Sequence, residues 1–191
     1  MEDSNQFYIT KLPKRIFIRP FLEKDIPALL HLESLGFPEE ERCSEETAIY
    51  RIKTCPDICS GLFIRKDETD EEVLVGEIMA TKISTEHITL KCMLPNENDE
   101  ASDVIAIHSV VIHPDYQGQN LARFLMTDYI QKLSQQEVCK KIVIIVHEHL
   151  FKFYEKLGFV KLSENEDVND PKSGFSKNGI WWNMEKELFN F

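Results

Sequence analysis

Three features of membrane, secreted and nucleic-acid-binding proteins are missing from this sequence. No apolar run approaches the roughly 18 residues that a membrane-spanning helix needs. The opening stretch MEDSNQFYITK holds no basic region followed by an apolar one, so we expect no secretion signal. Basic residues are few, 22 against 33 acidic ones, and the resulting net charge of −11 argues against a nucleic-acid partner.

Cysteine is scarce and its spacing is irregular. The five cysteines form no Cys-x-x-Cys pair, and their odd number leaves at least one of them unpaired. We therefore expect reduced thiols and a cytoplasmic protein, with the nucleus as an alternative setting. The excess of acidic residues suits a small cationic molecule or a basic peptide as partner.

The chain is long enough, at 191 residues, for one domain with a sizeable core. It has no internal repeat and no low-complexity segment. We expect a flexible leader over residues 1–14 and a single domain over residues 15–191. The polar, acidic segment 84–103 is expected to be a flexible insertion.

The spacing of apolar residues predicts an α/β domain with a mixed sheet. A hairpin around residues 67–72 implies antiparallel strands, and strand–helix alternation in the second half implies parallel ones. Ser44 is expected to cap a helix, and Glu33 is expected on the exposed side of the helix before it. The predicted strands are 15–20, 61–66, 72–83, 104–112, 140–148, 159–162 and 180–188, and the predicted helices are 23–37, 44–54, 120–134 and 150–158.

An apolar strand at 104–112 passes through a short polar turn into a helix that begins near Asn120. The start of a helix leaves amide hydrogens unpaired and carries partial positive charge, so it can hold an anion such as a pyrophosphate. The shape alone also fits an ordinary connection between a strand and a helix. Gly118 does not decide between the two, because a single glycine in a turn is common.

The residues of this segment, VVIHPDYQGQNLARFLM, resemble the acetyl-CoA signature of the GNAT N-acetyltransferase superfamily. Gln117 and Ala122 take the outer positions of that signature, and Asn120 stands where glycine is usual. Asparagine tolerates positive φ, so the turn can keep its shape. A second segment, FYEKLGF at 153–159, resembles the Phe-Tyr-x-x-x-Gly-Phe that follows the next strand in this superfamily.

The segments LESLGFP at 32–38 and CPDICSGLFIR at 55–65 resemble the arylalkylamine N-acetyltransferase branch, particularly its fungal members. The resemblance implies a GNAT fold, with a mixed and mostly antiparallel sheet, splayed strands 4 and 5, and flanking helices. It implies transfer of an acetyl group from acetyl-CoA to a primary amine of a polyamine or arylalkylamine. The transfer would occur by direct attack in a ternary complex, without a metal, in a monomer.

The resemblance also assigns binding residues. The backbone of Val110, Val111 and Ile112 would bind the pantetheine arm. Phe37, Ile145 and His147 would contact the substrate. The turn and the start of the helix would bind the rest of the cofactor through Gln117, Gly118, Gln119, Asn120, Leu121, Ala122 and Arg123.

Two further residues are assigned to proton transfer. His108 is the candidate base, with an expected apparent pKa between about 6 and 8, and Tyr154 is the candidate acid for the departing thiolate. Animal members of the branch have His-x-His at this place, whereas the first position here is Ala106. A histidine restored at position 106 would raise turnover if the neighbouring strand left room for it.

Two other functions stay open. A protein N-acetyltransferase would use the same cofactor residues and a wider groove. An acyl-CoA-binding module without catalysis would explain Ala106 and Asn120, although His108 and Tyr154 argue against it.

Overall fold

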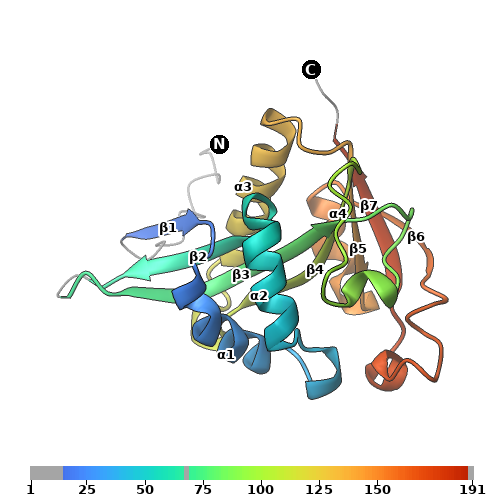
Figure 1. The fold of residues 1–191 in the computed structure, drawn as a ribbon, viewed down its shortest axis with the longest axis horizontal. Coiled ribbons are helices and arrows are strands. Elements are labelled where there is room, and N and C mark those ends of the chain that lie inside the picture. Colours follow the sequence, from blue (N-terminus) through green and yellow to red (C-terminus); the bar gives the residue numbers. More distant parts are fainter. Residues whose placement is uncertain (1–14, 67–68, 189–191) are drawn as a thin grey trace, which may run out of the picture.

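The computed structural model describes residues 15–66 and 69–188, so the predicted leader lies outside the described residues. These residues form a seven-stranded sheet in the order β1-β2-β3-β4-β5-β7-β6 (Figure 1). The β4–β5 pair is parallel and the other pairs are antiparallel, which confirms the predicted mixed sheet. The strands are β1 (Ile16–Arg19), β2 (Ser60–Arg65), β3 (Glu72–Lys82), β4 (Val104–Ile112), β5 (Lys141–Val146), β6 (Val160–Glu164) and β7 (Trp182–Glu187).

Helices cover both faces of the sheet, with α1 and α2 in front of it and α3 behind it in Figure 1. The helices are α1 (Ile26–Gly36), α2 (Glu45–Thr54), α3 (Leu121–Gln135) and α4 (Phe151–Lys156). Each is within a few residues of its predicted range. A 3-10 turn, Glu23–Asp25, replaces the first residues of the predicted helix 23–37.

Local sequence signals explain where the elements begin and turn. The Ser44 hydroxyl accepts a hydrogen bond of 3.1 Å from the amide of Thr47, so the predicted cap of α2 is confirmed. The predicted hairpin is also present, because β2 pairs antiparallel with the first part of β3, from Arg65 opposite Glu72 to Ser60 opposite Ile78. Gly36 ends α1 against β4, where an added Cβ would come within 2.7 Å of the Val111 side chain. This close approach places the next residue, Phe37, over the sheet.

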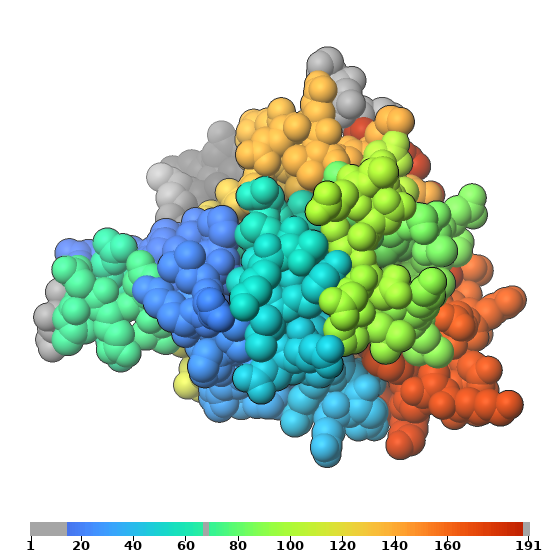
Figure 2. Space-filling view, in the orientation of Figure 1, coloured from blue at the N-terminus to red at the C-terminus, as the bar shows by residue number. Residues whose placement is uncertain are grey.

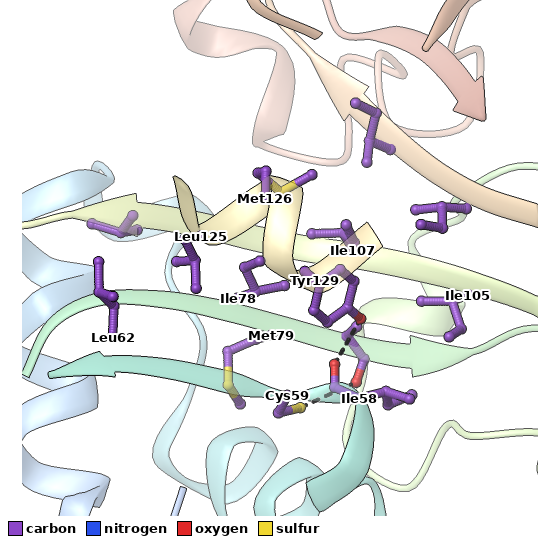
Figure 3. Packing of buried hydrophobic residues seen from close by; sticks show 14 of the residues in the cluster. Ile58, Cys59, Leu62, Ile78, Met79, Ile105, Ile107, Leu125, Met126 and Tyr129 are labelled. Atoms are coloured by element: carbon purple, nitrogen blue, oxygen red, sulfur yellow. Dashed lines mark hydrogen bonds between the residues drawn. The ribbon is translucent and has the colours of Figure 1, made fainter. Parts of the chain in front are cut away.

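The core lies between the sheet and its helices. Leu125, Met126 and Tyr129 of α3 pack onto strand residues such as Ile78 and Ile107 (Figure 3). The buried phenol of Tyr129 donates a hydrogen bond of 2.7 Å to the carbonyl of Ile58, drawn as a dashed line in Figure 3. A buried hydroxyl therefore has its partner, and α3 is tied to the segment before β2.

The segment 84–103 is packed against the domain, contrary to the predicted flexible insertion. Ile88 and Cys92 are buried in a small second cluster with residues of β4 and β5. The carbonyl of Ile88 accepts a hydrogen bond of 2.7 Å from the Asn165 side chain, and the amide of Leu90 donates one of 2.7 Å to Asp167. In Figure 2 this yellow-green segment lies directly beside α2. The polar composition of the segment favoured a flexible loop, but the buried side chains of Ile88 and Cys92 anchor it to the sheet.

Candidate active site

β4 and β5 pair over only three residues each, Val104, Ile105 and Ala106 with Lys141, Ile142 and Val143. Beyond this pairing the strands separate, as the predicted splay requires. A cavity of about 820 Å³ opens there. Its walls include Ile107 to Val110 of β4 and the end of β5, together with parts of α1, α2 and α4.

A β-bulge lies in β4 at the cavity. Ser109 faces Met79 of β3 and Ile107 faces Ala80, so His108 has no partner opposite it. A bulge of this kind re-aims side chains and is common beside active sites. Both His108 and Ser109 line the cavity as a result.

The imidazole of His108 is held as a neutral group. Its Nε2 shares a hydrogen bond of 2.7 Å with the Thr81 hydroxyl, and its buried Nδ1 has no hydrogen-bond partner within the described residues. Burial, with a smaller contribution from the Arg51 charge, lowers the pKa of His108 well below its ordinary value of 6.5. The expected apparent range of about 6 to 8 assumed a modest shift of this imidazole, whereas its burial, which was not visible in the sequence, shifts the pKa strongly downward.

Position 106 has no room for a histidine. Ala106 is fully buried between Thr81 of β3 and Val143 of β5, in the cluster that contains Ile88 and Cys92. A larger side chain would force these neighbours apart. The neighbouring strands therefore leave no room for a histidine at position 106, and restoring one is not expected to raise turnover.

Tyr154 comes from α4 and also lines the cavity. Its ring packs edge-on against Phe153 and Phe159, with centroids 5.0 and 5.6 Å away. Burial raises the pKa of Tyr154, so its phenol keeps its proton and can donate it. This position agrees with the predicted role, which stays a prediction.

The turn after β4 has the backbone that the sequence predicted. Asn120 adopts φ 59° and ψ 20°, in the left-handed region, directly before α3. Gly118 has φ 77°, and a Cβ there would meet no atom within 4 Å. The side chain of Gln117 donates a hydrogen bond of 3.1 Å to the carbonyl of Ile112, which ties the turn to the end of β4. The positive φ of Asn120 is confirmed.

The predicted cofactor residues fall into two groups. Val110 lines the cavity, whereas the side chains of Val111, Ile112 and Leu121 are buried in the core, so only their backbone can bind a ligand. The other residues form a more exposed surface that continues from the end of β4 and lies outside the cavity lining. They are Gln117, Gly118, Gln119, Asn120, Ala122 and Arg123.

The three predicted substrate residues, Phe37, Ile145 and His147, all line the cavity. His147 stacks on Trp181 with ring centroids 3.8 Å apart, and its Nδ1 lies 3.0 Å from the carbonyl of Ile180. Trp181 lines the cavity too and was not predicted. These residues give the cavity an aromatic wall.

Glu33 is 1% exposed, so its predicted position on the outer side of the helix is wrong. Its helical spacing from Ile26 and Leu29 places it on the apolar face of the helix. The expectation of exposure followed from its charge instead. Three more buried polar residues lie near it and were also missed. They are Arg51, Glu77 and Ser109, of which Arg51 and Ser109 line the cavity with Glu33.

Among residues 15–66 and 69–188, no three His, Cys, Asp or Glu side chains form a group that could hold a metal ion. Within the described part of the chain, every helix is too short or too polar to span a bilayer. All five cysteines are described, and each is free of a disulfide.

Residues 70–188 match the family model for the acetyltransferase (GNAT) domain. The chain belongs to the GNAT acetyltransferase family. An uncharacterized N-acetyltransferase, ycf52, of Porphyra purpurea is 31% identical over 93 residues, which are 42% of this chain and 53% of that protein. The chain thus spans about half the length of this GNAT relative.

Solved structures confirm the GNAT fold. The loading GNATL domain of CurA from Lyngbya majuscula superposes with a TM-score of 0.74 at 17% identity, over 91% of this chain and 98% of that one. GphF, a GNAT-like decarboxylase in complex with isobutyryl-CoA, gives 0.72 at 14% identity, over 91% of this chain and all of that one. At such low identities the likeness concerns the fold alone.

Proposed function

We propose that this protein transfers the acetyl group of acetyl-CoA to a primary amine. The observation that carries the proposal is the separation of β4 from β5, which leaves one edge of β4 without a strand partner among residues 15–66 and 69–188, beside a cavity of about 820 Å³. An extended pantetheine arm can bind such an edge as an added strand would. GNAT family membership and the acyl-CoA bound to GphF support this reading.

The turn after β4 fits the phosphates of CoA. Two residues with positive φ, Gly118 and Asn120, turn the backbone immediately before α3. The start of a helix such as α3 offers amide hydrogens and partial positive charge, which suit an anion. Gln117, bonded to Ile112, fixes the turn against β4. The backbone from Val110 to Arg123 would then hold acetyl-CoA.

Two side chains in the cavity are suited to the chemistry. An attacking amine becomes positively charged as it bonds to the thioester carbon, and the neutral imidazole of His108 can take a proton from it. The electron pair of the broken C–S bond goes to sulfur, and the phenol of Tyr154 can protonate the thiolate. A final proton transfer from His108 to Tyr154 restores both groups.

A polyamine or arylalkylamine is the substrate that we propose within the class of primary amines. The 3-10 turn Glu39–Glu41 is acidic, and Glu41 lines the cavity. Asn178 donates hydrogen bonds of 3.3 and 3.1 Å to Glu40 and Glu41, which holds these carboxylates in place. The acidic turn suits a cationic chain, and the wall formed by His147 and Trp181 suits an apolar or aromatic body.

A panel of acceptors tests the proposal. Release of CoA from acetyl-CoA would be measured with spermine, tryptamine, phenethylamine and a histone-tail peptide. Faster release with one of the amines is the expected result. Release with the peptide alone would make the protein a protein N-acetyltransferase. Tight binding of acetyl-CoA without release to any acceptor would make it a binding module.

A further inference from the structure

Four polar side chains from four different elements are buried beside the cavity. They are Glu33 of α1, Arg51 of α2, Glu77 of β3 and Ser109 of β4, with exposures of 1%, 3%, 0% and 7%. Three of them line the cavity, and Glu77 interacts with two, the Glu33 carboxyl and the Ser109 hydroxyl. The proposed mechanism for thioester attack uses none of the four.

Their hydrogen-bonding capacity is only partly used within the described chain. One oxygen of Glu33 accepts a hydrogen bond of 2.9 Å from the Cys43 amide, while its Oε1 has no partner among the residues that the structure describes. Both oxygens of Glu77, the Nε of Arg51 and the Oγ of Ser109 also lack a well-formed hydrogen bond. Buried polar atoms are nearly always paired, so the unpaired atoms of the three cavity-lining residues, Glu33, Arg51 and Ser109, indicate a site that a ligand completes.

The two carboxyl groups share this pocket with few other charges. Burial, and then the neighbouring Glu33, raises the pKa of Glu77 well above its ordinary value. Arg51 from α2 supplies the positive charge that faces the pair, and the thiols of Cys43 and Cys59 and the imidazole of His108 are neutral. The raised pKa favours the protonated form of Glu77, next to the carboxyl of Glu33.

We propose that Glu33 and Glu77 bind the ammonium group of the substrate and take its proton before the amine attacks. The proposal rests on the proposed amine acetylation. Glu33 lines the cavity and contacts the ammonium, so it is a catalytic residue. Glu77 lies behind it, outside the cavity lining, and is a positioning residue that acts through Glu33. Ser109 lies beside Glu77 and faces the cavity.

The proton balance of the reaction is complete with this pair. The N–H bond of the ammonium breaks and an O–H bond forms on the carboxyl pair, which leaves a neutral amine with a free electron pair. That electron pair forms the new N–C bond to the thioester, and the second proton leaves nitrogen for His108. The proton on the carboxyl pair then passes to solvent, as the overall reaction requires.

The decisive variant is Glu33→Gln, with Glu164→Gln on β6 as the control for the loss of one negative charge. Glu164 is exposed and far from the pair in sequence. Steady-state CoA release would be measured from about pH 5.5 to pH 10, with saturating acetyl-CoA and a strongly basic amine. We expect kcat/KM for the amine to fall about 100-fold in Glu33→Gln near neutral pH, with an unchanged KM for acetyl-CoA.

Two features of the result separate a proton acceptor from a structural role. The loss should shrink as the pH approaches about 10, where the amine becomes neutral in solution. It should also be small at every pH with 2,2,2-trifluoroethylamine, a weakly basic amine that is neutral near pH 7. A loss of equal size at every pH and with both amines would overturn the proposal.

Glu77→Gln gives a second test that does not depend on the folding of Glu33→Gln. It keeps the shape of a protonated carboxyl and leaves Glu33 in place. We expect about a tenfold loss of kcat/KM with the basic amine and a shifted pH profile. If both variants fold and keep the wild-type rate and pH profile, the proposed role of Glu33 and Glu77 in taking the proton is wrong. The proposed amine acetylation would be unaffected by that result. A wild-type protein that binds acetyl-CoA but acetylates no amine would overturn both proposals.

Discussion

Thr81 and His108 share a hydrogen bond of 2.7 Å across β3 and β4. The bond fixes the imidazole at the bulge and leaves its Nδ1 as the nitrogen without a partner in the described chain. Because the pKa of His108 lies well below 6.5, the ring is neutral above that pH. Its position is therefore controlled by Thr81, and its charge by burial.

His108→Gln should lower kcat about ten- to hundredfold without moving any limb of the pH–rate profile that lies above about pH 6.5. The reason is that His108 has already lost its proton in that range. Thr81→Val should lower kcat in the same direction, while Thr81→Ser, which keeps the hydroxyl, should stay close to wild type. A limb near pH 7 that disappears in His108→Gln would contradict this assignment.

Tyr154→Phe should keep the fold and the binding of acetyl-CoA but lower kcat about 100-fold. The phenol lines the cavity and keeps its proton at neutral pH, so its loss removes a proton donor rather than packing volume. Single-turnover CoA release and a thermal melt would be measured together. Full turnover in a folded Tyr154→Phe would reduce this residue to a packing role.

Asn120→Val should raise the KM for acetyl-CoA by about tenfold or more, because a β-branched residue is strained at φ 59°. Asn120→Gly is the matched control, since glycine adopts this conformation freely. It should keep wild-type cofactor affinity. Equal affinity in both variants, measured by titration with CoA, would place the phosphates elsewhere.

Glu77 should make the free energy of unfolding depend on pH. The pKa of Glu77 is raised in the folded state, so its contribution is fully present below the unfolded value of about 4.5 and is lost as the pH rises toward the folded pKa. Relative to Glu77→Gln, the wild-type protein should lose at most about 1.4 kcal/mol per pH unit above that value. Urea unfolding at several pH values checks this, and parallel curves for the two proteins would contradict it.

His108 makes the free energy of unfolding depend on pH in the opposite direction. Its folded pKa is depressed, so its contribution is present above the unfolded value of 6.5 and is lost as the pH falls below it. Both proteins in the urea comparison contain His108. Its contribution therefore cancels in the difference between them, which isolates Glu77.

The order of the elements followed from the sequence because helix and strand periods are local. The positive φ of Asn120 was also predictable, since the residue type itself favours it. The bulge at His108 was not, because it depends on the register between β3 and β4, which distant residues set. The same limit hid the depth of His108 and the neutral state that follows from it.

The buried carboxyl groups of Glu33 and Glu77 show a second limit of prediction from the sequence. The spacing of Glu33 marked it as part of the apolar face of α1, and Glu77 interrupts an apolar strand. A charge favours exposure, which holds for most glutamates but not for Glu33. Both residues would be found by asking which charged positions the hydrophobic period places inside.

The short pairing between β4 and β5 has a consequence for how the domain opens. Because three residues on each strand join β4 to β5, the sheet has two parts, β1 to β4 and β5 to β7, and each part can lose its backbone protection separately. A molecule held between the two strands would join these units. Its binding free energy would then add to the cooperativity of the whole domain, and amide hydrogens on both sides of the cavity would exchange more slowly together.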